Sequence, residues 1–321
     1  MRFNDGKASR TASYRGALRG DDAKMKRRHR ARGVSVWGII VLLTGLALLF
    51  YPYASSYLNQ IEQQKTVSLV SQTVENAQES DIAAQWDAAR RYNERLFAGM
   101  TCVVDPFDAE RATASNEEYA NALNVSGDGA MGEIIIPKIG VDLPIYHGTQ
   151  GDSMNHAVGH VTNTSLPVGG ESSHAVLAGH TGLVSAIIFD YLDKLEMGDV
   201  FVIRVLGHDL AYEVYSKETV LPDDTSSLGI QQGRDLVTLV TGTPYGVNSH
   251  RLLVHARRCA LPEGWSAHQG DGYGEGGWGV SNGLSLGWPL PLPVVVALAA
   301  FVTAMATLAG RFVARRKNGR G

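Results

Sequence analysis

The sequence predicts a mainly β domain, folded as a closed or nearly closed barrel or as a sandwich, with helices before it and short helical connections, between two transmembrane helices. Six short β-rich segments separated by turn residues lie between residues 133 and 258, a spacing typical of such all-β folds. Residues 54–99 show helical periodicity instead. The 321-residue chain has a formal charge of -3, which argues against general nucleic-acid binding.

The first expected transmembrane helix is the apolar run of residues 34–53. It follows a polar tail, residues 1–33, which ends in the strongly basic stretch 24–32 (KMKRRHRAR). The run contains no charged residue and has about the length that a helix needs to cross a bilayer. A cleaved signal peptide is the alternative. The long basic lead, the length of the run and the lack of a convincing cleavage site favour a retained helix.

The second expected transmembrane helix, residues 289–310, lies near the other end and precedes a basic tail, residues 311–321. Basic flanks tend to stay in the cytoplasm, and here they lie outside both apolar runs. We therefore expect a cell-membrane protein with two spans, both tails in the cytoplasm and the main domain outside.

The region between the spans is expected to hold three parts. Residues 54–125 begin with apolar residues spaced by three and four, typical of a helix or helix pair. Residues 126–260 form the β domain, with one or two helical turns at 184–195. Residues 261–288 are dense in glycine and are expected to be a linker. The expected strands lie in the segments 133–146, 174–180, 200–206, 210–220, 236–241 and 251–258.

The cysteines and histidines give no convincing metal or disulfide framework. An exported domain could pair Cys102 with Cys259, but one distant pair does not make a framework, and its spacing does not suggest zinc. A metal-dependent hydrolase using His156 and His160 is a further alternative. That pair lacks the glutamate of the zinc-protease motif, and the glycine and turn residues around it argue against a helix. We expect no cofactor and no metal.

Two strand ends carry residues that suit acyl transfer. His180 ends the small apolar segment 177–181 (LAGHT), and Arg251 opens the segment 251–258. A histidine can protonate a leaving amine, and an arginine can stabilise the negative charge that grows on an attacked carbonyl oxygen. Taken singly, each is more often an ordinary surface residue. The chemistry also needs a nucleophile, and Gly242 ends the neighbouring segment, where it offers no side chain.

The segments 134–149, 156–183, 189–199 and 238–254 resemble the class C, pilin-polymerising sortases of Gram-positive bacteria. The resemblance is nearly continuous through the β-rich region, includes the two-span layout, and implies a sortase-like closed β-barrel. In that family one strand reads Thr-Leu-Val-Thr-Cys-Thr-Pro-Tyr-Gly, where this chain reads TLVTGTPYG. The resemblance implies that His180 and Arg251 are catalytic residues and that Gly242 stands at the position of the missing cysteine nucleophile.

The resemblance also assigns a role to residues 105–107 (DPF). Class C sortases carry a lid with an Asp-Pro-aromatic motif over the active site. Asp105 would then pair with Arg251, and Phe107 would cover position 242. An exposed pair of this kind holds weakly, which suits a lid that opens. This chain departs from the family at Thr181, where arginine is frequent, and the departure is expected to affect lid or substrate contacts.

The function that the resemblance implies is transpeptidation. A thiolate attacks a Leu-Pro-x-Thr-Gly-like sorting signal and forms a thioester, and a pilin lysine amine takes the acyl group, so the expected partners are pilin subunits and sorting signals. Without the thiol we expect this chain to be inactive. Thr241 and Thr243 should face away from the site, and Cys102 is a remote substitute nucleophile. The alternative is a non-catalytic extracytoplasmic module that binds pilin or sorting-signal peptides.

Overall fold

The computed structural model describes residues 40, 43–52, 54–59, 61–99, 103–108, 117–183 and 185–265. They fall into two units, and each is considered by itself. One unit includes residues 43–52, which are helical and belong to the first expected span. Within the described ranges, no helix combines the length and the apolarity that crossing a bilayer requires. The second expected span, both tails and residues 266–288 of the expected linker lie outside the described residues.

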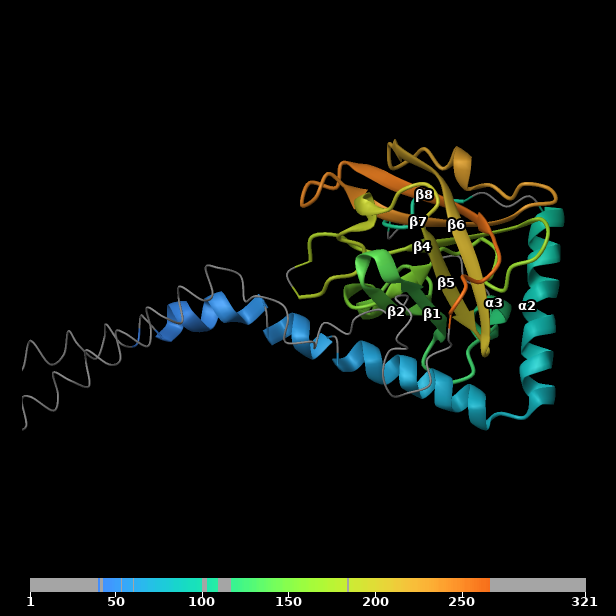
Figure 1. The fold of residues 1–321 in the computed structure, drawn as a ribbon, viewed down its shortest axis with the longest axis horizontal. Helices are drawn as coiled ribbons and strands as arrows, with labels where there is room; N and C mark the ends of the chain where they lie inside the picture. Colours follow the sequence, from blue (N-terminus) through green and yellow to red (C-terminus); the bar gives the residue numbers. More distant parts are fainter. Residues whose placement is uncertain are drawn as a thin grey trace, which may run out of the picture. The chain divides into compact units, whose positions relative to one another are not determined.

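The other unit begins with helices and continues into a β-barrel. Residues 61–76 are helical, and after a bend α2 follows (Glu79–Gly99). The short α3 (Glu117–Asn121) comes directly before the barrel. In Figure 1, α2 runs along one side of the barrel. The side chain of Asn93 fixes it there, because its amide donates to the Leu166 carbonyl at 3.0 Å and accepts from the Leu166 N–H at 2.7 Å.

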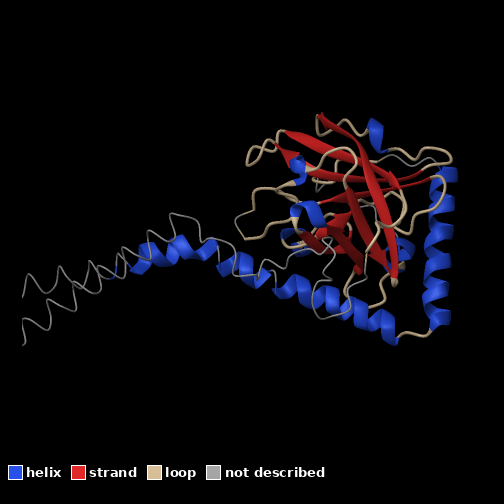
Figure 2. Ribbon diagram, in the orientation of Figure 1, coloured by secondary structure: helices blue, strands red, loops and turns tan. Residues whose placement is uncertain are grey.

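Eight strands close the barrel in the order β1-β2-β3-β4-β7-β8-β6-β5. Figure 2 shows them as one closed group with α2 outside. The pairs β2–β3 and β4–β7 are parallel, and the others are antiparallel. The strands are β1 (Ala130–Ile136), β2 (Val141–His147), β3 (Val158–His160), β4 (Ser173–Ala178), β5 (Val200–Val205), β6 (His208–Val220), β7 (Asp235–Thr243) and β8 (His250–Arg258). Short 3₁₀ turns are η1 (Pro137–Ile139), η2 (Asp152–Asn155), η3 (Leu192–Lys194) and η4 (Ser226–Leu228).

The barrel has apolar side chains on both faces of its central strands. Because neighbours on a strand alternate between faces, Leu239 on β7 and Val254 on β8 fill the interior core, whereas Val240 and Leu253 point outward. The outward residues form a second packed group, called here the outer cluster. Its members are Val103, Met154, Val161, Val176, Ala178, Leu228, Val240 and Leu253. The outer face of β4, β7 and β8 is therefore covered by other segments of the chain.

The predicted mainly β fold with preceding helices is confirmed, and of the two layouts the closed barrel is the one that forms. Two details differ from expectation. The segment 133–146 is two strands, because Pro137 opens a 3₁₀ turn and Gly140 has a φ of 65°. The three-residue strand β3 was not predicted. The expected helical turn within 184–195 is present as η3.

Candidate active site

Position 242 lies on the outer face of β7, in the same row as Val240 of the outer cluster. In the antiparallel ladder between β7 and β8, Gly242 is paired directly with Arg251. Arg251 points to the same face as Leu253 of the outer cluster, because the two residues are separated by one position. The ladder therefore places the arginine beside the position where the resemblance expects a cysteine.

His180 lies on the other side of position 242. The parallel ladder pairs Ala178 of β4 with Val240 of β7, and continuing that register by two residues brings His180 level with Gly242. Two hydrogen bonds extend the pairing beyond the last strand residue: the Gly179 N–H donates to the Val240 carbonyl at 3.0 Å, and the Thr241 hydroxyl donates to the Gly179 carbonyl at 2.8 Å. Histidine, residue 242 and arginine thus lie on three adjacent strands or strand ends.

The loop after His180 is held by Asp190, which sequence analysis had not singled out. Its carboxylate accepts from the Gly182 N–H at 3.0 Å and from the Ile188 N–H at 3.1 Å. The Phe189 N–H in turn donates to the His180 carbonyl at 3.1 Å. Asp190 is therefore a positioning residue for the backbone of His180. It lies in segment 189–199, which resembles the family, but no sequence pattern indicated its role.

The guanidinium of Arg251 connects two different segments. Its Nε and Nη2 donate to the two carboxylate oxygens of Asp105 at 2.9 and 2.7 Å. Its Nη1 donates to the carbonyl of Asn248 at 2.9 Å and to that of His250 at 3.3 Å. Such a two-pronged arginine–carboxylate contact is geometrically specific as well as strong. Arg251 therefore fastens residues near 105 to the turn between β7 and β8.

Residues 103–108, called here the lid segment, lie over the site. Asp105 and Phe107 belong to one tight turn, in which the Asp108 N–H donates to the Asp105 carbonyl at 3.1 Å. The Phe107 ring centroid lies 5.1 Å from that of His180 and 4.9 Å from the guanidinium carbon of Arg251. The expected Asp105–Arg251 contact is present, but the side chains are only 8% and 12% exposed. The expectation that this pair is exposed was wrong, because both side chains are largely buried and the Phe107 ring lies over the guanidinium.

The environment of His180 favours its neutral form. Burial lowers the pKa of His180 below its ordinary value of 6.5, and the positive charge of Arg251 lowers it further. A neutral imidazole beside an arginine has one nitrogen lone pair available to accept a proton. The site therefore holds a possible proton carrier and a fixed positive charge within one small, partly covered space.

The described side chains of Thr241 and Cys259 are poorly suited to act as a nucleophile in place of the cysteine that the resemblance expects at position 242. Thr241 is buried, and its hydroxyl is already donated to Gly179. Cys259 is a free thiol that follows β8, eight positions from Arg251, and burial raises its pKa. Cys102 lies outside the described residues, so its role as a substitute nucleophile stays a prediction, while the free thiol of Cys259 does not bear out a pairing of the two cysteines. The assignment of His180, Arg251, Gly242, Asp105 and Phe107 to catalytic and lid roles also stays a prediction.

The space next to Gly242 is filled by Asn248, a residue that sequence analysis treated only as part of a turn. A β-carbon placed on Gly242 would lie 2.5 Å from Oδ1 of Asn248 and 2.6 Å from its Cγ. Both separations are far below van der Waals contact. No sequence signal indicated this contact, because an asparagine after Pro-Tyr-Gly reads as ordinary turn composition.

The two histidines considered for a metal site are used differently. His160 is fully buried on β3, with Nδ1 2.9 Å from the Tyr119 hydroxyl and Nε2 2.8 Å from the Ser165 carbonyl. Burial lowers its pKa to about 4. His156 follows η2, so the pair does not share a helix face. In the described part of the chain, no group of three or more acidic, histidine or cysteine side chains could hold a metal ion.

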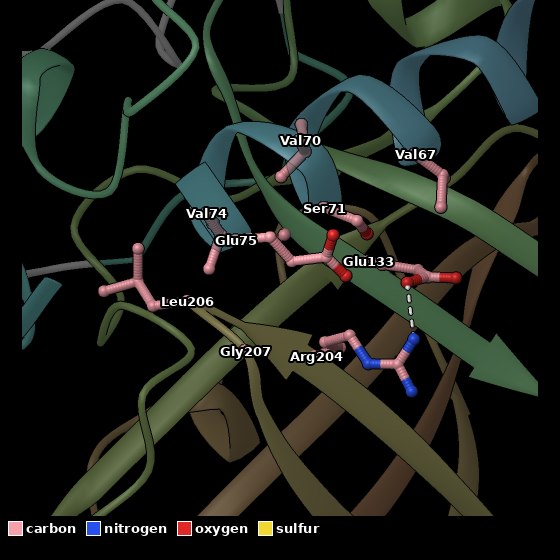
Figure 3. A pocket seen from close by; sticks show the side chains of 10 residues that line it. Val67, Val70, Ser71, Val74, Glu75, Glu133, Arg204, Leu206 and Gly207 are labelled. Atoms are coloured by element: carbon pink, nitrogen blue, oxygen red, sulfur yellow. Dashed lines mark hydrogen bonds and ion pairs between the residues drawn. The ribbon is translucent and has the colours of Figure 1, made fainter. Parts of the chain in front are cut away.

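A separate cavity of about 230 Å³ lies on the far side of the barrel, between the helix 61–76 and strands β1 and β5 (Figure 3). Glu75 reaches into it from the helix, and Glu133 lies below with Arg204, whose Nη1 is 3.5 Å from a Glu133 oxygen. Valines and a leucine form much of the rest of its wall. None of the residues around position 242 lines this cavity, so it is not part of the candidate active site.

The barrel domain is similar to known proteins over most of its length. A family model described as a sortase domain matches residues 134–259. Sortase D of Bacillus subtilis (strain 168) is 31% identical over 177 residues, which are 54% of this chain and 86% of the relative. The crystal structure of sortase C-1 from Actinomyces oris is 47% identical with a TM-score of 0.53, covering 56% of this chain and 99% of that one. Sortase C of Streptococcus pneumoniae is 37% identical with a TM-score of 0.56, covering 61% and 97%.

Proposed function

The chain belongs to the sortase family, whose members are cysteine transpeptidases, and from this premise we propose that it is a class C sortase that has lost its nucleophile. In the form with a cysteine at 242, the thiolate attacks a carbonyl of a Leu-Pro-x-Thr-Gly-like sorting signal. His180 protonates the leaving amine, and Arg251 stabilises the oxyanion. A lysine amine of a second pilin subunit then takes the acyl group from the thioester.

The observation that carries the proposal is that Gly242 and Arg251 lie on paired strands with His180 beside them, two residues beyond the end of β4. The ladder pairs Gly242 with Arg251, and the parallel register brings His180 level with Gly242. Strands fix side-chain positions more tightly than loops do, and a catalytic group must be held within about 0.5 Å of its productive position. This arrangement therefore supports an acyl-transfer site from which only the attacking atom is missing.

Glycine at 242 is expected to make the chain inactive in transpeptidation. A backbone without a thiol or hydroxyl offers no atom that can form the acyl intermediate. In a hydrolase of a different fold, loss of the nucleophile costs on the order of a millionfold in rate. Binding of the sorting signal does not need that atom, and it is expected to survive.

The direct test restores the nucleophile. We expect Gly242→Cys to cleave a sorting-signal peptide and to form a thioester detectable by mass spectrometry, whereas the glycine protein does neither. Gly242→Cys combined with His180→Ala is the matched control, because it keeps the thiol and removes the proton carrier. A cysteine variant that folds and gains nothing over the glycine form would sink the proposal.

The second candidate function is a non-catalytic module that binds pilin or sorting-signal peptides. The observation that favours it is the contact between Arg251 and Asp105, which is intact although residue 242 has no side chain to react. We expect calorimetry to detect binding of a sorting-signal peptide to the glycine protein. Arg251→Ala should lower the affinity of that binding. Because that change also releases the lid segment, Asp105→Ala, which keeps the arginine, is its control. Absence of binding in all three proteins counts against this function.

The cellular arrangement belongs to the same proposal. We expect two membrane spans, residues 34–53 and 289–310, with both basic tails in the cytoplasm and the barrel outside. Protease added to intact cells should then digest the barrel and spare tags on either tail. Protection of the barrel from that protease would contradict the arrangement.

A further inference from the structure

We propose that the carboxamide of Asn248 stands in for the missing side chain of residue 242: it contacts a peptide bound to the glycine site, and it must move before a thiol at 242 can react. The asparagine side chain lies where a side chain at 242 would begin. A β-carbon on Gly242 would lie 2.5, 2.6 and 2.9 Å from Oδ1, Cγ and Cβ of Asn248. The asparagine therefore fills the beginning of the path that a cysteine side chain would follow.

The backbone of Asn248 is held by contacts on both sides. Its N–H donates to the Pro244 carbonyl at 2.9 Å, and its own carbonyl accepts from Nη1 of Arg251 at 2.9 Å. Its φ is 56°, in the left-handed region that asparagine tolerates better than most residues. The backbone of Asn248 is therefore fixed from both sides, and only rotation of its side chain can clear the space.

Asn248 is exposed, and within the described residues its carboxamide makes no hydrogen bond, so its donor and its acceptor are both available. In a transpeptidase, the nucleophile's place is where the reacting carbonyl of the peptide arrives. A peptide that occupies the site in the glycine protein must therefore meet this amide, which can bond to a backbone C=O and N–H.

One arm of the experiment tests the steric part without any peptide. Gly242→Cys is prepared alone and with Asn248→Gly, and alkylation of residue 242 by iodoacetamide is timed by peptide mapping, which separates it from Cys102 and Cys259. We expect the double variant to react at least about tenfold faster. Glycine accepts the positive φ, so the turn is kept. Asn163→Gly is the control, because Asn163 has a φ of 62° on a different turn.

The lid segment could also limit access, and a second comparison separates the two barriers. Asp105→Ala is added to both cysteine variants. If Asn248 blocks the thiol, Asn248→Gly accelerates alkylation with the lid segment closed and with it released. If only the lid segment blocks the thiol, Asn248→Gly has no effect in either background, and that result overturns the proposal.

The other arm tests the ligand contact and rests on the proposed function. In the glycine protein, we expect Asn248→Gly to weaken binding of a sorting-signal peptide about threefold to tenfold, the range for one neutral hydrogen bond. Asn248→Asp keeps the shape of the side chain and loses the N–H donor. Its peptide affinity should lie between that of the glycine protein and that of Asn248→Gly. If Asn248→Gly leaves the peptide affinity unchanged, Asn248 does not contact the peptide. No affinity in any variant contradicts the proposed function instead, while the alkylation result still decides the steric part.

Discussion

Removal of the Asp105 carboxylate measures how firmly the lid segment is closed. Arg251 makes two charge-assisted hydrogen bonds to Asp105, at 2.9 and 2.7 Å, and the side chains are 12% and 8% exposed. Breaking a fully buried pair costs about 3–5 kcal/mol. Here Arg251 keeps the carbonyls of Asn248 and His250, and water can enter as the segment moves away. We therefore expect the lower range for hydrogen bonds to a charged group, about 1.5–3 kcal/mol.

That free energy corresponds to a fall of about 10- to 150-fold in the ratio of closed to open lid segments. Chymotrypsin cleavage after Phe107 reports this ratio, because proteolysis follows the open population when opening is fast compared with cleavage. We expect Asp105→Ala to be cut about 10- to 150-fold faster, and Asp105→Asn to be intermediate. Cleavage of the denatured proteins corrects for any change in the intrinsic susceptibility of the site.

The control breaks an exposed ion pair elsewhere. Lys65 and Glu62 lie 3.1 Å apart on the helix 61–76, with side chains 61% and 67% exposed. Such pairs contribute about 0–1 kcal/mol, so Glu62→Ala should leave cleavage after Phe107 unchanged. If Asp105→Ala is folded by circular dichroism and is cut no faster than the parent chain, the ion pair does not hold the lid segment and the reasoning is refuted.

Two further predictions concern titration. Removing the ring over the imidazole with Phe107→Ala should raise the pKa of His180 toward its ordinary value in an NMR titration, because burial is the larger cause of its lowering; an unchanged pKa would mean that the ring does not shield it. Burial and then Asp142 raise the pKa of Glu133 well above 4.5, although Arg204 opposes them. The contribution of the protonated Glu133 to the free energy of unfolding is therefore at its maximum below pH 4.5. It is lost as the pH rises through the raised pKa. Glu133→Gln, which resembles the protonated form, should flatten that loss in thermal melts between pH 5 and 9, and an unchanged slope would contradict this.

The spacing of apolar residues along the sequence predicted most strands, because a strand of this barrel carries apolar side chains on at least one of its faces. The segments 200–206 and 251–258 match β5 and β8 within one residue at each end. Barrel closure depends on a different kind of contact, the pairing of Glu133 on β1 with Arg204 on β5. Residues so far apart in sequence leave no periodic signal. β3 escaped prediction because three residues are too few to show alternation.

Sequence reasoning named His180, Arg251 and position 242, which the strand ladders bring close together, but it did not indicate that Asn248 occupies the space beside Gly242. His180 and Arg251 stand at strand ends, where a motif can be recognised, and the ladders then fix their neighbours. The burial of the Asp105–Arg251 contact could not be predicted, because it depends on how residues 103–108 pack against a strand far away in the sequence. The position of the Asn248 side chain could not be predicted either, because it depends on the conformation of the six residues, 244–249, between β7 and β8.

The contact with Asn248 also explains what glycine does at position 242. The backbone of Gly242 lies outside the left-handed region, so no conformational demand requires glycine there. Within a strand, glycine usually marks the close approach of another group. Here that group is the Asn248 side chain, with atoms 2.5–2.9 Å from where a β-carbon would lie, and not a neighbouring backbone. Even Gly242→Ala must therefore displace the asparagine. The space beside Gly242 is consequently packed, and a cysteine introduced at 242 would also require a new position for Asn248.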